Sequence, residues 1–233
     1  GGYGGATAAK YIRMLSNYKI SVILIEPNTN FISCPMSNLV IGGSKSLSDL
    51  TTTYDALMTK HGITLVRDKV TDIDAQKKSL RLLNGPTIAY DKLVLSPGVD
   101  MMFDGIEGLR EANAEGKILQ AWKAGPETLA LRKQLEAMPD GGTVIISAPA
   151  NPFRCPPGPY ERASLIAWYL KNKKPKSKLL ILDAKDAFSK QSLFTAAWKD
   201  IYGDMVEWIG LSGGGKVTEV KAKDKIFVTE FGE

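Results

Sequence analysis

One pattern occurs twice in this chain of 233 residues and restricts its fold more than any other feature. An apolar run ends at an acidic residue, first at Ile20–Ile25 before Glu26 and again at Lys178–Leu182 before Asp183. Apolar runs of this length are typical of buried parallel strands, and a segment with helical apolar spacing precedes each of them. Two strand–helix–strand units in succession predict an α/β fold with two Rossmann-like dinucleotide-binding units.

The first unit opens with small residues that suit the phosphate-binding turn of such a fold. Gly1–Ala9 contains four glycines and runs directly into a helical pattern. Glycine lets the backbone approach a pyrophosphate, and a helix N-terminus supplies amide donors and partial positive charge. Gly2 and Gly5 take the places of the second and third motif glycines, and Glu26 lies where a ribose hydroxyl binds. A flexible glycine-rich start before an ordinary helix is the alternative.

The rest of the first half predicts a loop, a helix and a series of short strands. The loop after Glu26 carries a single cysteine, Cys34, and its polar neighbours Ser37 and Asn38 argue against burial in a core. His61 stands before Gly62 at the end of the helix, which indicates a C-terminal turn residue and not a base. The helix is expected near residues 50–60, and turn-separated strands are expected at residues 63–66, 70–73, 79–82, 87–90 and 92–98.

The second half repeats the unit after a polar connection at residues 105–115, which is a candidate hinge. We divide the chain into a first domain, residues 1–108, and a second domain, residues 109–233. Flavoproteins with two such domains bind FAD in the first and normally bind NAD(P)H in the second. Helices are expected at residues 126–138, 162–171 and 192–201, and strands at residues 143–148, 178–183, 205–209, 216–220 and 225–229.

The turn after the strand at residues 143–148 departs from that plan. A glycine-rich loop would hold a dinucleotide phosphate there, but residues 148–159 contain five prolines and Cys155. Proline lacks an amide donor and fixes φ, so this loop does not suit a phosphate. We expect the second domain to have lost nicotinamide binding and to offer Cys155 to a flavin for sulfur chemistry. A cysteine in a turn that merely stiffens a domain junction is the alternative.

Composition argues against several other classes of site. Two cysteines are too few for a disulfide scaffold, and with one histidine and no CxxC pair they give poor support for a metal site. The net charge of +5 comes with no nucleic-acid motif, and the lysines between Lys171 and Lys178 indicate a solvated helix end and turn. No apolar stretch reaches the roughly 18 residues needed to cross a bilayer.

The two ends of the sequence fall inside recognisable patterns. The chain begins within a glycine motif without a methionine, and it ends just after a strand pattern. We therefore expect a fragment that is truncated at both ends, without its first strand and its C-terminal domain.

Several motifs match a known flavoprotein family. Gly4–Tyr11, Ile25–Thr29, Ala121–Gly125 and, with the highest specificity, Pro152–Ser164 resemble the flavoprotein subunit of flavocytochrome c sulfide dehydrogenase. That family is a relative of the sulfide:quinone oxidoreductases within the glutathione-reductase-like flavoproteins, and the similarity runs over the whole chain. The resemblance implies an FAD-dependent enzyme that oxidises sulfide to sulfur or polysulfide.

The resemblance also implies roles for individual residues. Cys34 resembles the cysteine that bonds covalently to the 8α-methyl group of FAD. Cys155 resembles one half of a redox disulfide whose partner lies beyond this chain, and Glu161 resembles the acid/base of the site. The expected catalytic residues are thus Cys155 and Glu161. The expected cofactor-binding residues are Gly2, Tyr3, Gly4, Gly5, Glu26, Pro27, Cys34, Val70, Ser96, Pro97, Gly98, Trp122 and Lys123.

A reaction sequence and a partner follow from the same resemblance. Hydrosulfide opens the disulfide and leaves a persulfide on one cysteine, and the thiolate that is released passes electrons to the flavin. The electrons then go singly to haem c, which is carried only by a c-type cytochrome subunit. The family is periplasmic, so we expect a periplasmic protein whose signal peptide is not in this chain.

Alternatives stay open for each of these roles. Cys34 as an inert thiol beside noncovalent FAD and a direct Cys34–Cys155 disulfide are two of them. Glu161 as a simple acid at a helix start is a third, and Trp122 and Lys123 as packing and surface residues are a fourth. A sulfide:quinone oxidoreductase would need an amphipathic membrane-binding segment. A nonenzymatic flavin-fold module that binds a cytochrome or a sulfur carrier would show no sulfide-dependent bleaching of a flavin.

Overall fold

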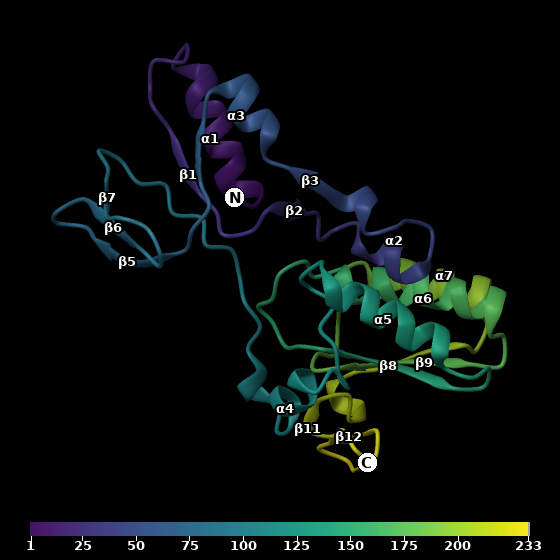
Figure 1. Cartoon of the computed structure of the whole chain (residues 1–233). Helices are drawn as coiled ribbons and strands as arrows, with labels where there is room; N and C mark the ends of the chain where they lie inside the picture. The colour runs from purple at the N-terminus through teal and green to yellow at the C-terminus, as the bar shows by residue number, and fades with distance from the viewer. Residues whose placement is uncertain (233) are drawn as a thin grey trace. The chain divides into compact units, whose positions relative to one another are not determined.

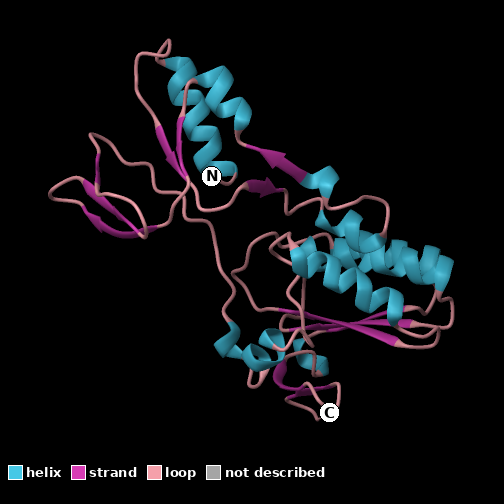
Figure 2. Ribbon diagram, viewed as in Figure 1, coloured by secondary structure: helices cyan, strands magenta, loops and turns pink. Residues whose placement is uncertain are grey.

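The computed structural model describes residues 1–232 and divides the chain into two compact units. Unit 1 comprises residues 1–32 and 51–100, and unit 2 comprises residues 33–50 and the chain from residue 101 onward. Each unit combines helices with short sheets (Figure 2), which confirms the predicted α/β class. The contacts assign residues 33–50 to unit 2. The domain division at residue 108 rests on sequence pattern and stays a prediction.

Unit 1 is built around a helix and two short parallel strands (Figure 1). Helix α1 (Tyr3–Leu15) leads to β1 (Ile23–Ile25), which pairs in parallel with β4 (Thr64–Val66). Helix α3 (Asp55–His61) packs against α1, and β2 (Asn30–Ile32) pairs with β3 (Thr51–Thr53) in antiparallel fashion. The first predicted strand is thus shorter than expected. The buried core of these elements consists of Ala9, Leu24, Tyr54 and Ile63.

The predicted meander also lies in unit 1. Strands β5 (Val70–Asp74), β6 (Ser79–Leu82) and β7 (Ile88–Ala89) form an antiparallel sheet in that order. The strand expected at residues 92–98 does not form, and Val94 and Leu95 are exposed. A strand is held by hydrogen bonds to a neighbouring strand. Among the described residues this segment has no such neighbour, so its apolar pattern produces no strand.

Unit 2 has three layers, with a parallel sheet in the middle. Every strand of that sheet was predicted. The sheet has the order β10 (Val206–Ile209), β9 (Lys178–Asp183), β8 (Thr143–Ala148). Figure 1 shows helices on both faces of the sheet, with α5 (Pro126–Ala137), α6 (Gly158–Lys173) and α7 (Gln191–Tyr202) on one face and α4 (Leu109–Ala114) with the hairpin of β11 (Val217–Lys221) and β12 (Ile226–Thr229) on the other.

Strand β9 shows why its sequence is a continuous apolar run. Leu179 and Ile181 belong to the buried cluster under α6 and α7, whereas Leu180 and Leu182 pack in the cluster on the hairpin side. A strand that is covered on both faces needs apolar residues at every position. The run ends at Asp183, whose side chain is fully buried.

Several segments that were expected to be irregular are helical. Helix α2 (Ser37–Gly42) follows Cys34, and α4 occupies the second half of the candidate hinge. Cys34 is half-buried and lies outside the buried core, as expected, although its neighbours Ser37 and Asn38 are buried. Short 3₁₀ turns lie at Ser48–Leu50, Phe103–Gly105 and Leu211–Gly213.

Two predictions about the ends of helices need correction. Helix α6 begins at Gly158, four residues before the predicted start, because Pro159 suits the first turn of a helix. In the lysine run, Lys174 is buried and not solvated. Its Nζ donates to the carbonyl oxygens of Leu135 and Glu136 at 2.7 Å each, and also to that of Met138. Lys174 thereby caps the C-terminal end of α5, where the helix dipole favours a cation.

Candidate functional site

The glycine segment of unit 1 forms a tight turn at the start of α1. A side chain at Gly1 would place its Cβ 2.6 Å from Oε2 of Glu26 and 2.8 Å from the hydroxyl of Tyr54, so a larger residue would have to displace these side chains. The first turn of α1 contains no acidic residue, and no side chain caps it. A helix start of this kind suits an anion such as a dinucleotide phosphate. The turn fits the cofactor that was predicted for it.

Ser96 is brought next to the same turn although its segment is not a strand. A Cβ at Gly4 would lie 3.2 Å from the Ser96 hydroxyl, and a Cβ at Gly5 would lie 3.5 Å from the Ser96 Cβ. Small residues on α1 therefore let the segment around Ser96 approach the helix. Three of the predicted cofactor-binding residues, Gly4, Gly5 and Ser96, meet at one place in unit 1.

Glu26 stands at the carboxyl end of β1, as its sequence position predicted. It is 7% exposed, and its carboxylate accepts hydrogen bonds from the backbone amide of Asn28 at 2.7 Å and from the Asn28 side chain at 2.6 Å. Burial raises the pKa of Glu26, whereas the two hydrogen bonds from Asn28 lower it. The residue is an anion at neutral pH, suitable for accepting a hydrogen bond from a ribose hydroxyl.

The other predicted residues of unit 1 make few contacts with this turn. Pro27, Pro97 and Gly98 are exposed, and a Cβ at Gly98 would have no neighbour within 4 Å. Val70 opens β5 opposite Leu82 and is half-buried. Tyr3 packs edge to face on Phe31, with ring centroids 4.9 Å apart. The cofactor roles of these residues stay predictions.

Cys155 lies in the turn between β8 and α6 of unit 2. Its side chain is exposed, and its backbone has φ of 62°, in the left-handed region. The amide of Gly158 donates to the Cys155 carbonyl at 2.8 Å. A Cβ at Gly158 would lie 3.2 Å from the Cys155 Sγ, so the thiol lies directly over the first turn of α6.

Cys34 belongs to the same unit and is held by residues far away in the sequence. Its thiol donates to the carbonyl oxygen of Trp122, and Nη2 of Arg154 lies 3.2 Å from its sulfur. Arg154 also donates to the Trp122 carbonyl, while the Trp122 indole donates to the Arg154 carbonyl at 2.7 Å. Both cysteines are free thiols. Trp122 thus connects the Cys34 segment to the residue before Cys155.

The turn that carries Trp122 and Lys123 has its own organiser, which sequence reasoning missed. The side-chain oxygen of Gln120 accepts hydrogen bonds from the backbone amides of Trp122 at 2.8 Å and Lys123 at 2.7 Å. Trp122 is half-buried and Lys123 is exposed. Trp122 therefore contacts Cys34 and the residue before Cys155. The proximity of Lys123 to a cofactor stays a prediction.

Helix α6 begins with an acid and an arginine of very different exposure. Glu161 is exposed in the first turn, and its predicted acid/base role stays a prediction. Arg162 is buried, donates from Nη2 to the Ala121 carbonyl at 2.7 Å, and lies over the Trp122 ring at 5.3 Å from its centroid. Neither Arg154 nor Arg162 was predicted. Helical spacing places Arg162 on the same face of α6 as Gly158 and Ile166, which are buried. A cation on that face was the sequence signal that could have identified it.

Asp183 takes the position of a ribose-binding acid in unit 2, but internal donors occupy it. Its carboxylate accepts from the Tyr160 hydroxyl at 2.5 Å and from the Trp208 indole at 2.9 Å, and it pairs with Lys185 at 2.5 Å. Burial, followed by the bond to Asp183, raises the pKa of Tyr160. A carboxylate with no exposed surface is not accessible to a nucleotide.

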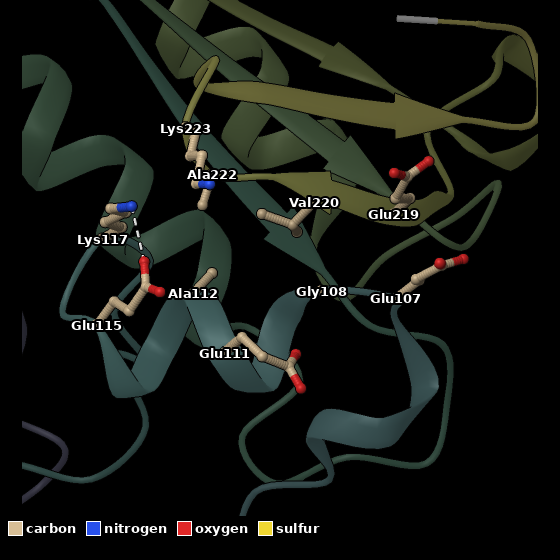
Figure 3. A pocket seen from close by; sticks show the side chains of 10 residues that line it. All are labelled: Glu107, Gly108, Glu111, Ala112, Glu115, Lys117, Glu219, Val220, Ala222 and Lys223. Atoms are coloured by element: carbon tan, nitrogen blue, oxygen red, sulfur yellow. Dashed lines mark ion pairs between the residues drawn. The ribbon is translucent and has the colours of Figure 1, made fainter.

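A cavity of about 460 Å³ lies elsewhere in unit 2, between α4 and β11. Figure 3 shows that its wall carries four glutamates, with Glu115 paired to Lys117 at 2.7 Å. The cavity contains neither cysteine. Among residues 1–232, no three acidic, histidine or cysteine side chains are grouped to hold a metal ion.

Comparison with known proteins identifies the kind of chain to which this site belongs. Residues 1–132 match the pyridine nucleotide-disulphide oxidoreductase family, and residues 128–233 match the central part of the sulfide dehydrogenase [flavocytochrome c] flavoprotein chain. The flavoprotein chain from Chlorobaculum thiosulfatiphilum is 58% identical over 40 residues, which cover 17% of this chain and 81% of that relative. This chain belongs to the flavocytochrome c sulfide dehydrogenase flavoprotein family.

Longer relatives and a solved structure agree with the assignment. The mitochondrial sulfide:quinone oxidoreductase of Dictyostelium discoideum is 26% identical over 173 residues, which cover 73% of this chain and 37% of that protein. The chain thus spans well under half the length of such relatives. The crystal structure of the sulfide:quinone oxidoreductase from Aquifex aeolicus superposes with a TM-score of 0.79 at 21% identity, covering all of this chain and 54% of that one, and so shows the same fold. No helix in the described part is long and apolar enough to span a membrane.

Proposed function

We propose that the full-length protein is an FAD-dependent sulfide dehydrogenase that oxidises sulfide to sulfur or polysulfide. The observation that carries this proposal is the placement of Cys155. A thiol lies over the N-terminus of α6, at the strand-to-helix turn where a dinucleotide domain would hold a phosphate. A helix N-terminus favours negative charge, so it suits a cysteine that must react as a thiolate. Membership of the flavocytochrome c sulfide dehydrogenase family supports the same reaction.

Cys155 acts as one half of a disulfide with a cysteine outside this chain. The sulfur of hydrosulfide attacks one disulfide sulfur, the S–S bond breaks, and a persulfide forms on the attacked cysteine. The other cysteine leaves as a thiolate and carries the electron pair of the broken bond. Glu161, one turn into α6, accepts the proton of the persulfide in this proposal. Its exposure on the first turn of α6 leaves it free to exchange that proton with water.

The proposal assigns cofactor roles to residues of each unit separately. The glycine turn, with Ser96 and Glu26, holds the dinucleotide part, and Cys34, beside Trp122, forms a thioether with the flavin. A bound FAD would supply a two-electron acceptor that can also release single electrons. Arg154, which contacts the Cys34 sulfur at 3.2 Å, orients that cysteine for attachment.

The electron donor in this proposal is sulfide and not a nicotinamide. The turn after β8 has lost amide donors to its prolines, and Asp183 already binds three internal donors. These two features support the loss of nicotinamide binding in the second domain. They leave the carboxyl edge of the sheet to Cys155.

The acceptor in this proposal is a c-type cytochrome subunit in the periplasm, which carries the haem. The printed names of several relatives indicate quinone as the alternative acceptor. Both acceptors are compatible with the cysteine site, and the experiment below distinguishes them.

The test uses the full-length protein with sulfide and either oxidised cytochrome c or a soluble quinone. We expect sulfide-dependent reduction of the cytochrome, and we expect Cys155→Ser to lower its rate at least a hundredfold. Ser192→Ala, in α7, is a control that should retain the rate. An unchanged rate in Cys155→Ser would exclude Cys155 from the reaction, and reduction of quinone alone would replace the proposed acceptor.

Covalent attachment of FAD has a separate test that does not depend on turnover. Acid-precipitated protein should retain its yellow flavin, and Cys34→Ala should release the flavin into the supernatant. Release from the unsubstituted protein would show that the cofactor is noncovalent.

A further inference from the structure

Arg162 is a buried cation without a matching anion. The residue is 7% exposed, and its Nε has no hydrogen-bond partner. One guanidinium nitrogen donates to the Ala121 carbonyl at 2.7 Å, and the Trp122 ring lies beneath the group. A carbonyl and an indole supply partial negative charge only. Among the described residues, no carboxylate forms an ion pair with Arg162.

Such an arrangement costs stability unless something else uses the charge. Removing an ion from water costs several kcal/mol even after the protein relaxes, and a buried arginine is normally paired. Burial lowers the pKa of Arg162 to about 10, and electrostatic interaction with Cys34, Cys155 and Glu161 opposes that fall. The guanidinium therefore remains charged at neutral pH, and two of the three groups that stabilise it are the thiols of the site.

Helix geometry places Arg162 on the same side of α6 as the Cys155 sulfur. Residues four apart in a helix lie one above the other. The Cys155 Sγ packs over Gly158, and Arg162 is the residue one turn later on that face. On the other side, Trp122 connects Arg162 to Cys34, because its ring faces the guanidinium and its carbonyl accepts from the Cys34 thiol.

We infer that Arg162 is a positioning residue that supplies the counter-charge for an anionic sulfur at Cys155. The anion is the Cys155 thiolate, or the sulfur of a persulfide that it carries. This inference rests on the proposed function for the identity of the anion, whereas the positive potential at Cys155 belongs to the fold itself. Arg162 raises the local concentration of anionic reactants at the sulfur and acts through it, without a bond to a reacting atom.

A purely structural role would use different features of the same side chain. In that case Arg162 matters because it ties the Ala121 carbonyl and the Trp122 ring to α6, and its charge is incidental. The two roles separate when the charge is kept and the planar guanidinium is lost, as in Arg162→Lys. They also separate when a thiol reagent is varied in charge but not in reaction type.

The experiment compares two disulfide reagents that react with Cys155 in the full-length, reduced protein. One reagent is the dianion 5,5′-dithiobis(2-nitrobenzoate), and the other is the neutral 4,4′-dithiodipyridine. Peptide mass spectrometry follows modification of Cys155 alone, so that other cysteines do not contribute. The ratio of the two rates reports the electrostatic potential at the sulfur and cancels changes in its accessibility.

We expect Arg162→Gln to lower the ratio of the anionic to the neutral rate about fivefold to tenfold. Arg162→Lys should keep the ratio within about twofold, because the charge remains. Arg110→Gln is the matched control, since Arg110 is exposed and paired with Asp104 at 2.6 Å, and it should leave the ratio unchanged.

An unchanged ratio in folded Arg162→Gln would overturn the inference, and so would a ratio lost in Arg162→Lys. If Arg162→Gln fails to fold, as judged by circular dichroism, the lysine variant still decides between charge and structure. The measurement needs no turnover of sulfide. Loss of the ratio in Arg162→Gln in a protein that does not oxidise sulfide would support the counter-charge and refute the proposed function alone.

Discussion

At the scale of single residues, Cys155 is in a conformation that its side chain does not favour. Its φ of 62° lies in the left-handed region, where a residue with a Cβ is disfavoured by roughly 1–2 kcal/mol. Glycine occupies that region without this cost, although it loses more chain entropy on folding. The turn therefore accepts a strained residue, and what it gains is a thiol over the start of α6.

This strain predicts an unusual order of stability among variants. Cys155→Gly should be more stable than Cys155→Ala by about 1 kcal/mol, because only the glycine relieves the left-handed strain. Urea denaturation followed by circular dichroism measures the difference. Cys34 has no left-handed backbone, so at that position alanine should be at least as stable as glycine. The same order at both positions would show that the Cys155 turn relaxes without cost.

The residues that sequence reasoning found and missed differ in what determines their role. Glu26 was located because it directly follows an apolar strand, and Cys155 because it lies in the turn between an apolar strand and a helix; both strand ends can be read from a local pattern. Arg154 and Arg162 were missed because their partners in the Trp122 turn lie more than 30 residues away. A contact of that kind follows from packing, which no local pattern encodes.

At the scale of elements, Asp183 joins two strands and a helix of unit 2. It ends β9 and accepts hydrogen bonds from Tyr160 of α6 and Trp208 of β10. The ion pair with Lys185 is also nearly buried. An acid that would face a nucleotide in the typical fold is here a structural joint between elements.

Replacement of this acid should therefore affect stability strongly. Asp183→Asn removes the charge that Lys185 requires and should cost about 2–4 kcal/mol of unfolding free energy. Urea denaturation checks the value. The matched control is Asp204→Asn, whose ion pair with Lys199 is exposed and which should leave the midpoint unchanged. Equal midpoints for the two variants would contradict the structural role of Asp183.

Lys174 provides a second prediction for an element, the C-terminal end of α5. Lys174→Met keeps the aliphatic stem but leaves the carbonyls of Leu135, Glu136 and Met138 without their donor. Hydrogen bonds to a charged donor contribute more than neutral ones, so we expect a loss of about 2–3 kcal/mol. Thermal denaturation measures it, with the exposed Lys173→Met as the control. A similar melting temperature for both variants would show that water replaces the ammonium group.

Elements with a complete local signal were predicted well, and those that depend on a neighbour were not. Strands β8 and β9 formed at the predicted residues because their apolar runs are buried on both faces of one sheet. The run at residues 92–98 has a shorter apolar core, Leu93–Leu95, and no strand beside it among the described residues. Hydrophobic pattern indicates what a segment can become, and strand pairing decides whether it does so.

At the scale of the whole molecule, the chain contains the two dinucleotide-type regions in different chemical states. The glycine turn of unit 1 leads into a helix start without an acidic residue or a side-chain cap, and Glu26 lies at the end of β1. The corresponding edge of unit 2 has a proline turn, a thiol and an acid that is fully occupied. Under the proposed function, the first region holds the dinucleotide and the second holds the reacting sulfur.

This asymmetry predicts how the full-length protein responds to two reductants. Sulfide should bleach the flavin absorbance near 450 nm within the mixing time, roughly seconds, as expected for thiol–disulfide chemistry beside a flavin. NADH at millimolar concentration should leave the absorbance unchanged. It should also leave the melting temperature unchanged, because a ligand that does not bind the folded state cannot stabilise it.

The two readouts distinguish a lost site from a slow one. A rise in melting temperature with NADH but no bleaching would mean that unit 2 still binds the nucleotide. The conclusion that Asp183 is inaccessible to a nucleotide would then be wrong. Bleaching by NADH would restore the usual role of the second domain and remove the reason for a thiol at its edge. If NADH neither raises the melting temperature nor bleaches the flavin, while sulfide does bleach it, then Asp183 at the end of β9 supports the structure and does not recognise a cofactor. The turn after β8 has then become the route by which electrons enter.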